Sequence, residues 1–534
     1  MGCTTILVGR KASYDGSTII ARNEDSANGE FNPKRFVVIR PQDQPRRYHS
    51  MISGLTIDLP DDPLQYTAAP NADPSEGVWG EAGVNEANVA MSATETLTTN
   101  ERVLGADPLV ERVPAHGVEG EDGYEPGVPG GIGEEDFLTI VLPYVRTARE
   151  GVRRLGSLLE RYGTYEMNGV AFSDVHEIWW METVGGHHWI ARRVPDESYV
   201  TMPNQLGIDE FDLDDALGEQ EQHMCSADLA GFIADHHLDL AVESTTPFDP
   251  RDAFGSHSDS DHVYNTPRAW FMQRFLNPYD EMWDGEEADH RPSSDDIPWA
   301  RQPERKITIE DVKYVLSSHY QGTPYDPYGR LGTDATRRML RPIGINRQSE
   351  LAVIQIRPYR PQSCRTVQWM AFGSNPFNAL VAFYANVDST PEYLAATTTR
   401  VTTESLYWEN RVIAALCDAH FADTANAVER YQELMGGLSH RLLAATDDQV
   451  ARLGGTEEYE AADRARKDDE DEDVDPLAPE DVVAATRDAG VREVLRSANQ
   501  TMADQLRENT DALLNDVLYT VSMDMRNGFN RSDR

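Results

Sequence analysis

The residues best suited to covalent chemistry lie at the very start of the chain. Cys3 opens an apolar, β-branched run, and Arg22 and Asp25 lie in a polar cluster that ends a second such run. The turn signal Asp15-Gly16 between the runs predicts a β-hairpin that returns this cluster to the neighbourhood of Cys3. A neighbouring guanidinium favours the thiolate, which is the nucleophilic form of cysteine.

An N-terminal cysteine would also carry its own base. If Cys3 became the first residue, its α-amine, with a pKa of about 7.7–8, could take the thiol proton at neutral pH. Asp25 could then orient that amine. The alternative is structural, with Cys3 as a small buried residue and Arg22 and Asp25 in an ion pair, because free cysteines are commonly buried and inert. The residue types alone leave both interpretations open.

The composition is strongly acidic. The 534 residues include 91 acidic and 48 basic ones, a formal net charge of −43, and only five lysines. Such an excess predicts a protein adapted to concentrated salt, where screening removes self-repulsion, although an ordinary acidic protein is the alternative. Nucleic acids and anionic membranes are poor partners for this charge.

The cysteines and the apolar runs predict a soluble cytoplasmic protein. The four cysteines form no CxxC pair, which fits a reducing compartment. No apolar run reaches the roughly 18 residues of a membrane span, and the start of the chain lacks the features of a signal peptide. A homo-oligomer is compatible with these observations.

Strands and helices are expected in a mixed order. A helix is predicted over 152–159 with Gly163 as its stop, and another begins at the candidate cap Thr308. From Glu404 onward the pattern is largely helical. Strands are expected at 36–39, 55–59, 169–172, 177–182, 187–191, 364–370 and 382–387.

Two segments are expected to lie outside this regular structure. Residues 101–136, rich in Gly, Pro and Glu, predict a long loop that is either a lid or a surface excursion. Residues 456–479 contain a run of like charges and predict a mobile, solvated segment. We therefore expect a catalytic domain over 1–400 and a helical C-terminal region over 401–534.

Several of these motifs resemble one known family. The early cysteine, the Asp15–Thr18 turn and the Ala21–Asp25 cluster are similar to the start of the C69 dipeptidases, which are N-terminal-nucleophile hydrolases related to secernin. Gly83–Glu86 and the Glu177–Trp189 hairpin also fit that pattern. The resemblance implies an α+β fold, a four-layer αββα sandwich with a helical C-terminal region. It also implies a cysteine-type dipeptidase that needs neither cofactor nor metal.

The resemblance adds further candidate residues. Asn204 follows a strand and matches an oxyanion-binding asparagine; an uncharged amide suits that task, although a loop-capping role is the alternative. Arg268, after a Thr-Pro pair, matches an active-site arginine. The second oxyanion donor of the related acylases falls near Thr94-Glu95, where a backbone N–H could replace it and Glu95 could meet a substrate ammonium group.

Other functions remain as alternatives. An acylase of a different linear amide would use the same residues, and a secernin-like protein need not be an enzyme. A metallopeptidase lacks a ligand set, because His187-His188 has no partner at metal-site spacing and no HExxH is present. No G-x-S-x-G elbow is found. The dipeptidase interpretation requires removal of Met1-Gly2, by self-cleavage or by another protease.

Overall fold

The predicted hairpin lies at the centre of the molecule. The structure is a computed structural model that describes residues 2–27, 29–242, 247–454 and 479–527. Strand β1 (Thr4–Val8) pairs antiparallel with β2 (Thr18–Asp25), and Thr5 lies opposite Arg22. This confirms the hairpin and places Cys3 just before β1.

The hairpin belongs to a seven-stranded antiparallel sheet. Its order is β14-β12-β1-β2-β15-β16-β17, so β2 pairs with a strand from far along the chain. The other strands of this sheet are β12 (Tyr199–Met202), β14 (Ala300–Arg301), β15 (Gln348–Ile356), β16 (Thr366–Phe372) and β17 (Val381–Tyr384).

A second, six-stranded antiparallel sheet faces the first. Its order is β13-β11-β10-β9-β8-β7. Its strands are β7 (Ala82–Val84), β8 (Ala90–Thr96), β9 (Asn168–Ser173), β10 (Ile178–Thr183), β11 (Trp189–Arg193) and β13 (His223–Cys225). Two short pairs lie apart: β3 (Val37–Ile39) with β6 (Tyr66–Ala68), and β4 (Arg47–His49) with β5 (Thr56–Asp58).

The space between the sheets is filled by apolar side chains from both. Leu7 and Ile20 of the first sheet share one buried cluster with Ala171 and Trp180 of the second. Side chains alternate between the two faces of a strand, so Arg22 points to the same inner face as Ile20. The hairpin therefore aims Arg22 between the sheets.

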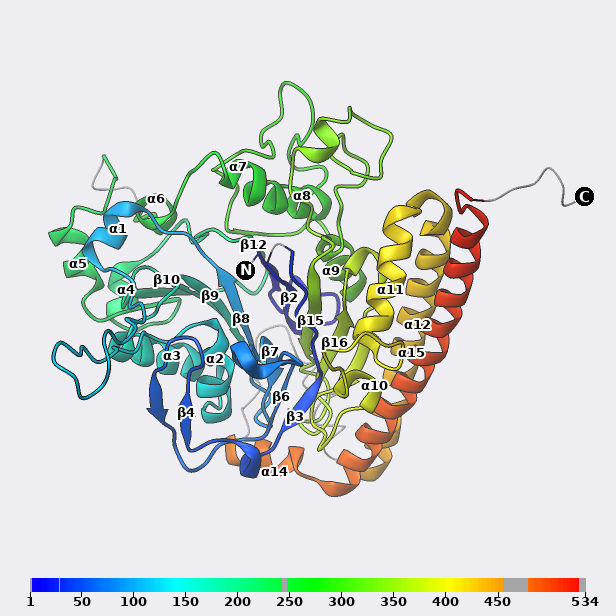
Figure 1. Ribbon diagram of the computed structural model, residues 1–534, viewed down its shortest axis with the longest axis horizontal. Coiled ribbons are helices and arrows are strands. Elements are labelled where there is room, and N and C mark those ends of the chain that lie inside the picture. Colours follow the sequence, from blue (N-terminus) through cyan, green and yellow to red (C-terminus); the bar gives the residue numbers. More distant parts are fainter. Residues whose placement is uncertain (1, 28, 243–246, 455–478, 528–534) are drawn as a thin grey trace, which may run out of the picture.

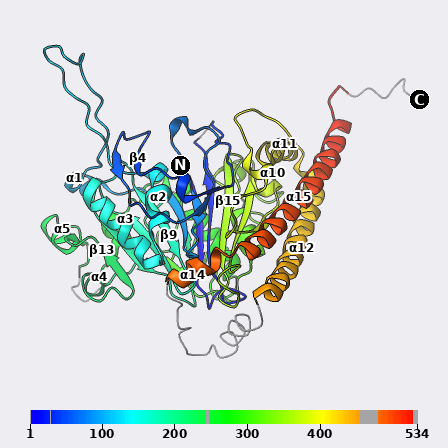
Figure 2. The ribbon, with the colours of Figure 1, turned by 90° about the horizontal axis from the view of Figure 1, so that it is seen from below.

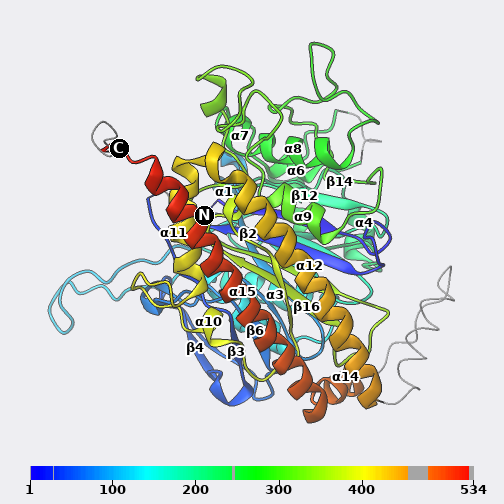
Figure 3. The same cartoon turned by 90° about the vertical axis from the view of Figure 1, so that its right-hand side faces the viewer.

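Helices cover the outer faces of both sheets. Figures 1 and 2 show α2 (Glu134–Val141) and α3 (Ala148–Tyr162) against the six-stranded sheet. Helices α8 (Thr266–Leu276) and α9 (Ile309–Leu316) pack on the outer side of the other sheet. In Figure 3 the long helices α12 (Phe421–Gly454) and α15 (Ala489–Met523) lie over this same side. The predicted α+β class is confirmed.

The remaining helices are short or lie near the C-terminus. They are α1 (Glu101–Ala106), α4 (Leu213–Leu217), α5 (Leu229–Asp235), α6 (Pro250–Phe254), α7 (Asp261–Tyr264), α10 (Glu392–Ala395), α11 (Leu406–Ala419) and α14 (Pro479–Thr486), with short 3-10 turns at Pro41–Asp43, Pro74–Glu76, Leu142–Tyr144, Thr336–Arg338 and Asn375–Phe377. The described residues after Leu406 are mainly helical, as expected.

Two local helix signals are confirmed. Helix α3 ends at Gly163, whose φ of +66° lies in the left-handed region that glycine adopts at low cost. Helix α9 begins with a capping box, in which the Thr308 hydroxyl accepts from Asp311 N and the Asp311 carboxylate accepts from Thr308 N.

The prediction of one loop over 101–136 is wrong at both ends. Asn100 caps α1 by accepting from the N–H groups of residues 102 and 103, and α2 begins at Glu134. Between these helices, Val113 pairs with Val128 and His116 with Glu125, and Figure 2 shows this part extending away from the body. The segment predicted to be acidic and mobile, residues 456–479, lies outside the described residues except for its last residue.

Two further observations concern the cysteines and the helices. All four cysteines are buried and free. No helix in the described part of the chain combines the length and apolar character needed to cross a membrane.

Candidate active site

The structure brings Cys3 and Arg22 into direct contact. Arg22 Nη2 donates to Cys3 Sγ over 2.9 Å, and both side chains are almost fully buried. A guanidinium stays charged at all relevant pH values and stabilises a thiolate beside it. The contact forms because Cys3 precedes β1 where its partner strand β2 carries Arg22.

Two carboxylates fix the position of Arg22. Glu81 lies 2.5 Å from Nη1 and Glu134 lies 3.0 Å from Nη2, while the carbonyl of Ala93 accepts from Nη1. Glu81 precedes β7 and Glu134 begins α2, so both come from the layers opposite the hairpin. The guanidinium is thus held from the second sheet and cannot rotate away from the sulfur without breaking these bonds.

A buried cluster of charges surrounds this contact. Lys34 Nζ lies 2.8 Å from Glu24 and 3.4 Å from Glu81. Burial alone would lower the pKa of Lys34, but these carboxylates outweigh it and raise that pKa. Burial raises the pKa of Glu24, and it raises the pKa of Glu350 to about 8, with Glu81 adding to both shifts. Glu350 is therefore mostly protonated at neutral pH.

Arg268 joins Cys3 to Asn204. Its Nη1 donates to the carbonyl of Cys3 and to Thr4 Oγ1, 2.8 Å away, and its Nη2 donates to Asn204 Oδ1 over 2.7 Å. An arginine can only donate, so the amide oxygen of Asn204 must face it, and the NH₂ group of that amide points away. That orientation leaves the amide's donors directed away from the guanidinium, as an oxyanion-binding group requires.

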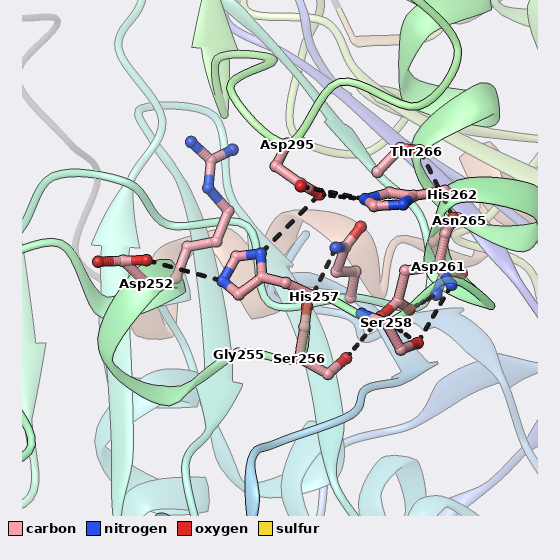
Figure 4. Close-up of polar contacts among 12 residues, drawn as sticks. Asp252, Gly255, Ser256, His257, Ser258, Asp261, His262, Asn265, Thr266 and Asp295 are labelled. Carbon is pink, nitrogen blue, oxygen red and sulfur yellow. Dashed lines mark hydrogen bonds and ion pairs between the residues drawn. The ribbon is translucent and has the colours of Figure 1, made fainter.

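A polar network behind Arg268 sets its position. Asn265 Oδ1 accepts from Arg268 Nη2 over 2.7 Å, and Asn265 Nδ2 donates to Asp261 over 2.5 Å. Asp261 also accepts from Ser256 and from the hydroxyl and N–H of Ser258 (Figure 4). The segment that precedes α8 is thereby bonded to the guanidinium of Arg268, which contacts the carbonyl of Cys3.

Figure 4 also shows a histidine pair at the edge of this network. His262 Nε2 lies 3.0 Å from Asp295, and His257 Nδ1 lies 3.8 Å from the same carboxylate. These groups are partly exposed and join the segment before α8 to the chain around residue 295. They therefore connect two loop segments and are not among the contacts of Cys3.

Asp25 reaches the chain start through an arginine. Its side chain lies on the outer face of β2, opposite to Arg22, and it accepts from Arg341 Nη2. The same nitrogen donates to the carbonyl of Gly2, which precedes Cys3. Asp25 is therefore connected to the peptide bond before Cys3 by one intervening guanidinium.

The region of the second expected oxyanion donor lies on β8. The pairing of β8 with β9 shifts register between Ala93 and Glu95, so the backbone is irregular there. The carbonyl of Ala93 accepts from Arg22, which places this part of β8 beside the guanidinium that contacts Cys3. The side chains of Thr94 and Glu95 lie outside what the structure describes.

The histidines singled out in the sequence have a structural partner. Asp107 contacts Nδ1 of His187 at 3.0 Å and Nδ1 of His188 at 2.7 Å, and it accepts from both backbone N–H groups. The described residues contain one group with ligand atoms close enough for a cation, His420, Asp423 and Asp524, and it does not include this histidine pair. It is largely exposed and includes none of the candidate site residues.

Sequence reasoning missed the groups that hold the arginines. Glu81 and Glu134 on Arg22, Asn265 on Arg268, and Arg341 on Asp25 were not singled out. A partial signal existed for Glu134, because it lies near the end of the Gly-rich segment 101–136, which was expected to be either a lid or a surface excursion. Nothing local marks Glu81 or Arg341, since their partners lie far away in sequence.

Several known proteins are similar to this chain over most or all of its length. The family model described as peptidase family C69 matches residues 2–434. The chain is 74% identical to a protein named "Dipeptidase" from Bifidobacterium longum (strain NCC 2705) over the full length of both. It is 50% identical to "Probable dipeptidase A" of Streptococcus pyogenes serotype M3 (strain SSI-1), again over both full lengths. It is also 44% identical to "Dipeptidase A" of Lactobacillus helveticus, over 85% of this chain and 90% of that protein. The chain belongs to peptidase family C69 and is a hydrolase of peptide bonds.

Proposed function

We propose that this protein is a cysteine-type dipeptidase whose nucleophile is Cys3 at a processed N-terminus. The observation that carries the proposal is the buried contact of Cys3 Sγ with Arg22 at the start of the chain. The names of the relatives at 74%, 50% and 44% identity support dipeptides as substrates.

The residues around Cys3 suggest a sequence of steps. The α-amine of Cys3 takes the thiol proton, and the sulfur attacks the peptide carbonyl to form a C–S bond. Asn204 and a backbone N–H bind the oxyanion, and the α-ammonium gives its proton to the leaving nitrogen as the C–N bond breaks. Water then hydrolyses the thioester and restores the thiol. Arg22 stabilises the thiolate, and Arg268 holds Asn204 and the carbonyl of Cys3 in place.

The proposal includes removal of Met1-Gly2. In the described chain Gly2 is still bonded to Cys3, and its carbonyl accepts from Arg341. Cleavage of that bond frees the α-amine of Cys3. Asp25, which Arg341 links to the Gly2 carbonyl, could then orient that amine. The position of Asp25, one guanidinium away from the Gly2 carbonyl, supports this orienting role.

The fold is part of the same proposal. We infer that the two facing sheets and their outer helices form the four-layer αββα sandwich of N-terminal-nucleophile hydrolases. Residues 1–400 would contain the catalytic machinery and 401–534 a helical C-terminal region. The free buried cysteines support a reducing, cytoplasmic compartment, and the acidic composition supports adaptation to salt.

The test combines the N-terminus with the nucleophile. Intact mass and N-terminal sequencing of purified protein should show a chain that starts at Cys3 and hydrolyses dipeptides. Cys3→Ala should fold, keep Gly2 if cleavage is intramolecular, and lose hydrolysis. Cys364→Ala is the matched control, because Cys364 is also fully buried but lies at the other side of the seven-stranded sheet; it should keep full activity.

Two results would contradict the proposal. A fully active chain that still starts at Met1 or Gly2 would exclude the α-amine as the base. Undiminished dipeptide hydrolysis by Cys3→Ala would exclude Cys3 as the nucleophile.

A further inference from the structure

The space around Gly2 is closed and rich in arginine. Gly2 is buried, Arg341 donates to its carbonyl, and a Cβ atom built on it would collide with the Tyr264 hydroxyl and lie 3.1 Å from Arg347 Nη2. We call this space, bounded by Tyr264, Arg341 and Arg347, the leader socket. Only a residue without a side chain fits in it as the chain is described.

The arginines of the leader socket have spare capacity to bind an anion. Arg347 donates to Tyr264 Oη over 2.5 Å, its Nε is buried without a partner, and no carboxylate among the described residues pairs with it. Arg341 has one carboxylate, Asp25, and its Nε is also buried without a partner. In a protein with a net charge of −43, these two neighbouring guanidiniums have only one carboxylate partner among the described residues, the Asp25 that pairs with Arg341.

Tyr264 holds these groups together. The centre of its ring lies 5.1 Å from the guanidinium carbon of Arg341 and 5.2 Å from that of Arg268, so two cations stack on it. Tyr264 precedes α8, and the network of Asp261 and Asn265 that positions Arg268 comes from the same segment. The socket and the nucleophile are therefore set by one structural unit.

The chemistry of the proposed reaction places the leaving amino acid in this socket. The α-amine of Cys3 must give its proton to the leaving nitrogen, so the leaving residue has to lie directly beside that amine. In the uncleaved chain this place is taken by Gly2, which is bonded to the same nitrogen. When Gly2 departs, the leaving residue of a substrate can enter the vacated space.

The last peptide bond of a peptide, which is the only one in a dipeptide, differs from every earlier bond at this position. The residue that leaves from it carries a free carboxylate two bonds from the nitrogen, whereas a residue that leaves from an earlier bond carries an uncharged peptide bond there. Guanidinium groups bind carboxylates with short, charge-assisted hydrogen bonds. We propose that Arg347 and Arg341 bind the C-terminal carboxylate of the substrate, and that this contact confines cleavage to the last peptide bond, the only bond that a dipeptide has.

This inference rests on the proposed function, because it assumes a chain that starts at Cys3. The test compares L-alanylglycine, whose leaving residue has no side chain, with its C-terminal amide, L-alanylglycinamide, as substrates of the processed protein. The wild-type protein should show a kcat/KM for the dipeptide at least about 10-fold above that for the amide. Arg347→Gln should lower kcat/KM for the dipeptide by about 10- to 100-fold and for the amide by less than about 3-fold, the range expected for one charge-assisted hydrogen bond.

Controls separate binding from folding and from net charge. Arg338→Gln removes an exposed arginine and should leave both rates unchanged. Arg347→Lys keeps a cation and should recover part of the preference for the dipeptide. Thermal unfolding of each variant shows whether it folds; if Arg347→Gln does not fold, the same comparison is made with Arg347→Lys alone, which should still lose part of that preference.

The outcomes distinguish the two proposals. Equal losses on dipeptide and amide, or a wild-type protein without preference between them, would overturn the carboxylate contact and leave the cysteine mechanism standing. Absence of hydrolysis of both substrates by a chain that starts at Cys3 would overturn the proposed function itself.

Discussion

The Arg22 guanidinium divides its donors between one sulfur and two carboxylates. Glu81 and Glu134 keep it in place, and Nη2 serves Cys3 and Glu134 together. A lysine has a single ammonium group and cannot span these three positions. The geometry at the thiol therefore depends on the planar fork of arginine and not only on its charge.

Replacing Arg22 by lysine tests that dependence. We expect Arg22→Lys to lower kcat/KM for dipeptides by about 10- to 100-fold, since one charge-assisted hydrogen bond to the thiolate is lost. Alkylation by iodoacetamide as a function of pH should show a higher thiol pKa in the variant. Arg10→Lys, which changes a partly exposed ion pair with Asp196 at the other end of the hairpin, is the control. Unchanged kinetics in Arg22→Lys would exclude the guanidinium as the thiolate stabiliser.

Glu350 gives a prediction about pH. Burial raises its pKa to about 8 in the folded protein, against about 4.3 for an unfolded chain. Between about pH 4 and about pH 8 the folded protein keeps a proton on Glu350 that the unfolded chain has lost. The contribution of Glu350 to the free energy of unfolding is therefore full below about pH 4 and is lost as the pH rises to about 8. Glu350→Gln should make the free energy of unfolding fall less steeply with pH, by up to about 1.4 kcal/mol per pH unit.

Urea unfolding at pH 5, 6, 7 and 8 measures this effect. The control is Asp73→Asn, because the pKa of Asp73 is lowered, chiefly by the hydrogen bond from the Ser75 N–H; its removal should not flatten the decline. A wild-type protein and a Glu350→Gln variant with parallel pH dependence would contradict a protonated Glu350.

At the scale of elements, the sequence predicted what local signals determine. The hairpin of β1 and β2, the end of α3 at Gly163 and the cap of α9 at Thr308 each follow from residues a few positions apart. The contact of Cys3 with Arg22 follows from the hairpin alone. Helix α1 was missed because it has only six residues and directly precedes a stretch rich in glycine and proline.

The cap of α9 gives a prediction at this scale. Thr308→Ala removes the acceptor for the Asp311 N–H and should lower the free energy of unfolding by about 1 kcal/mol. Because α9 packs on the outer face of β1 and β2, away from the sulfur, kcat/KM at 25 °C should not change. Urea unfolding with parallel kinetics checks both, and Thr308→Ser should restore the stability. A full loss of activity would show that α9 acts on the site directly.

At the scale of the whole molecule, the sequence could not give the pairing of distant segments. Strand β15 lies beside β2 although more than 300 residues separate them, and Arg341 meets Asp25 across a similar distance. Glu81 and Glu134 reach Arg22 only because the two sheets face each other. Such contacts depend on tertiary packing, which has no local signature; the family resemblance, not periodicity, supplied Asn204 and Arg268.

The net charge predicts how stability responds to salt. Self-repulsion in a protein of charge −43 is screened as the Debye length falls from about 10 Å at 0.1 M to about 3 Å at 1 M salt. The midpoint of thermal unfolding should therefore rise by several degrees between these concentrations. Tetramethylammonium chloride at equal ionic strength separates screening from specific cation binding. A midpoint that falls or stays constant in both salts would contradict net repulsion as a limit on stability.

The proposed cleavage after Gly2 would also determine how activity develops in time. The bond before Cys3 has Arg341 on its carbonyl oxygen and Arg22 on the neighbouring sulfur, all within one chain. Maturation by such a bond cleavage is a first-order event. Freshly made protein would then become active after a lag whose half-time is the same at every dilution, whereas maturation by a separate peptidase would shorten the lag as more of that peptidase is added.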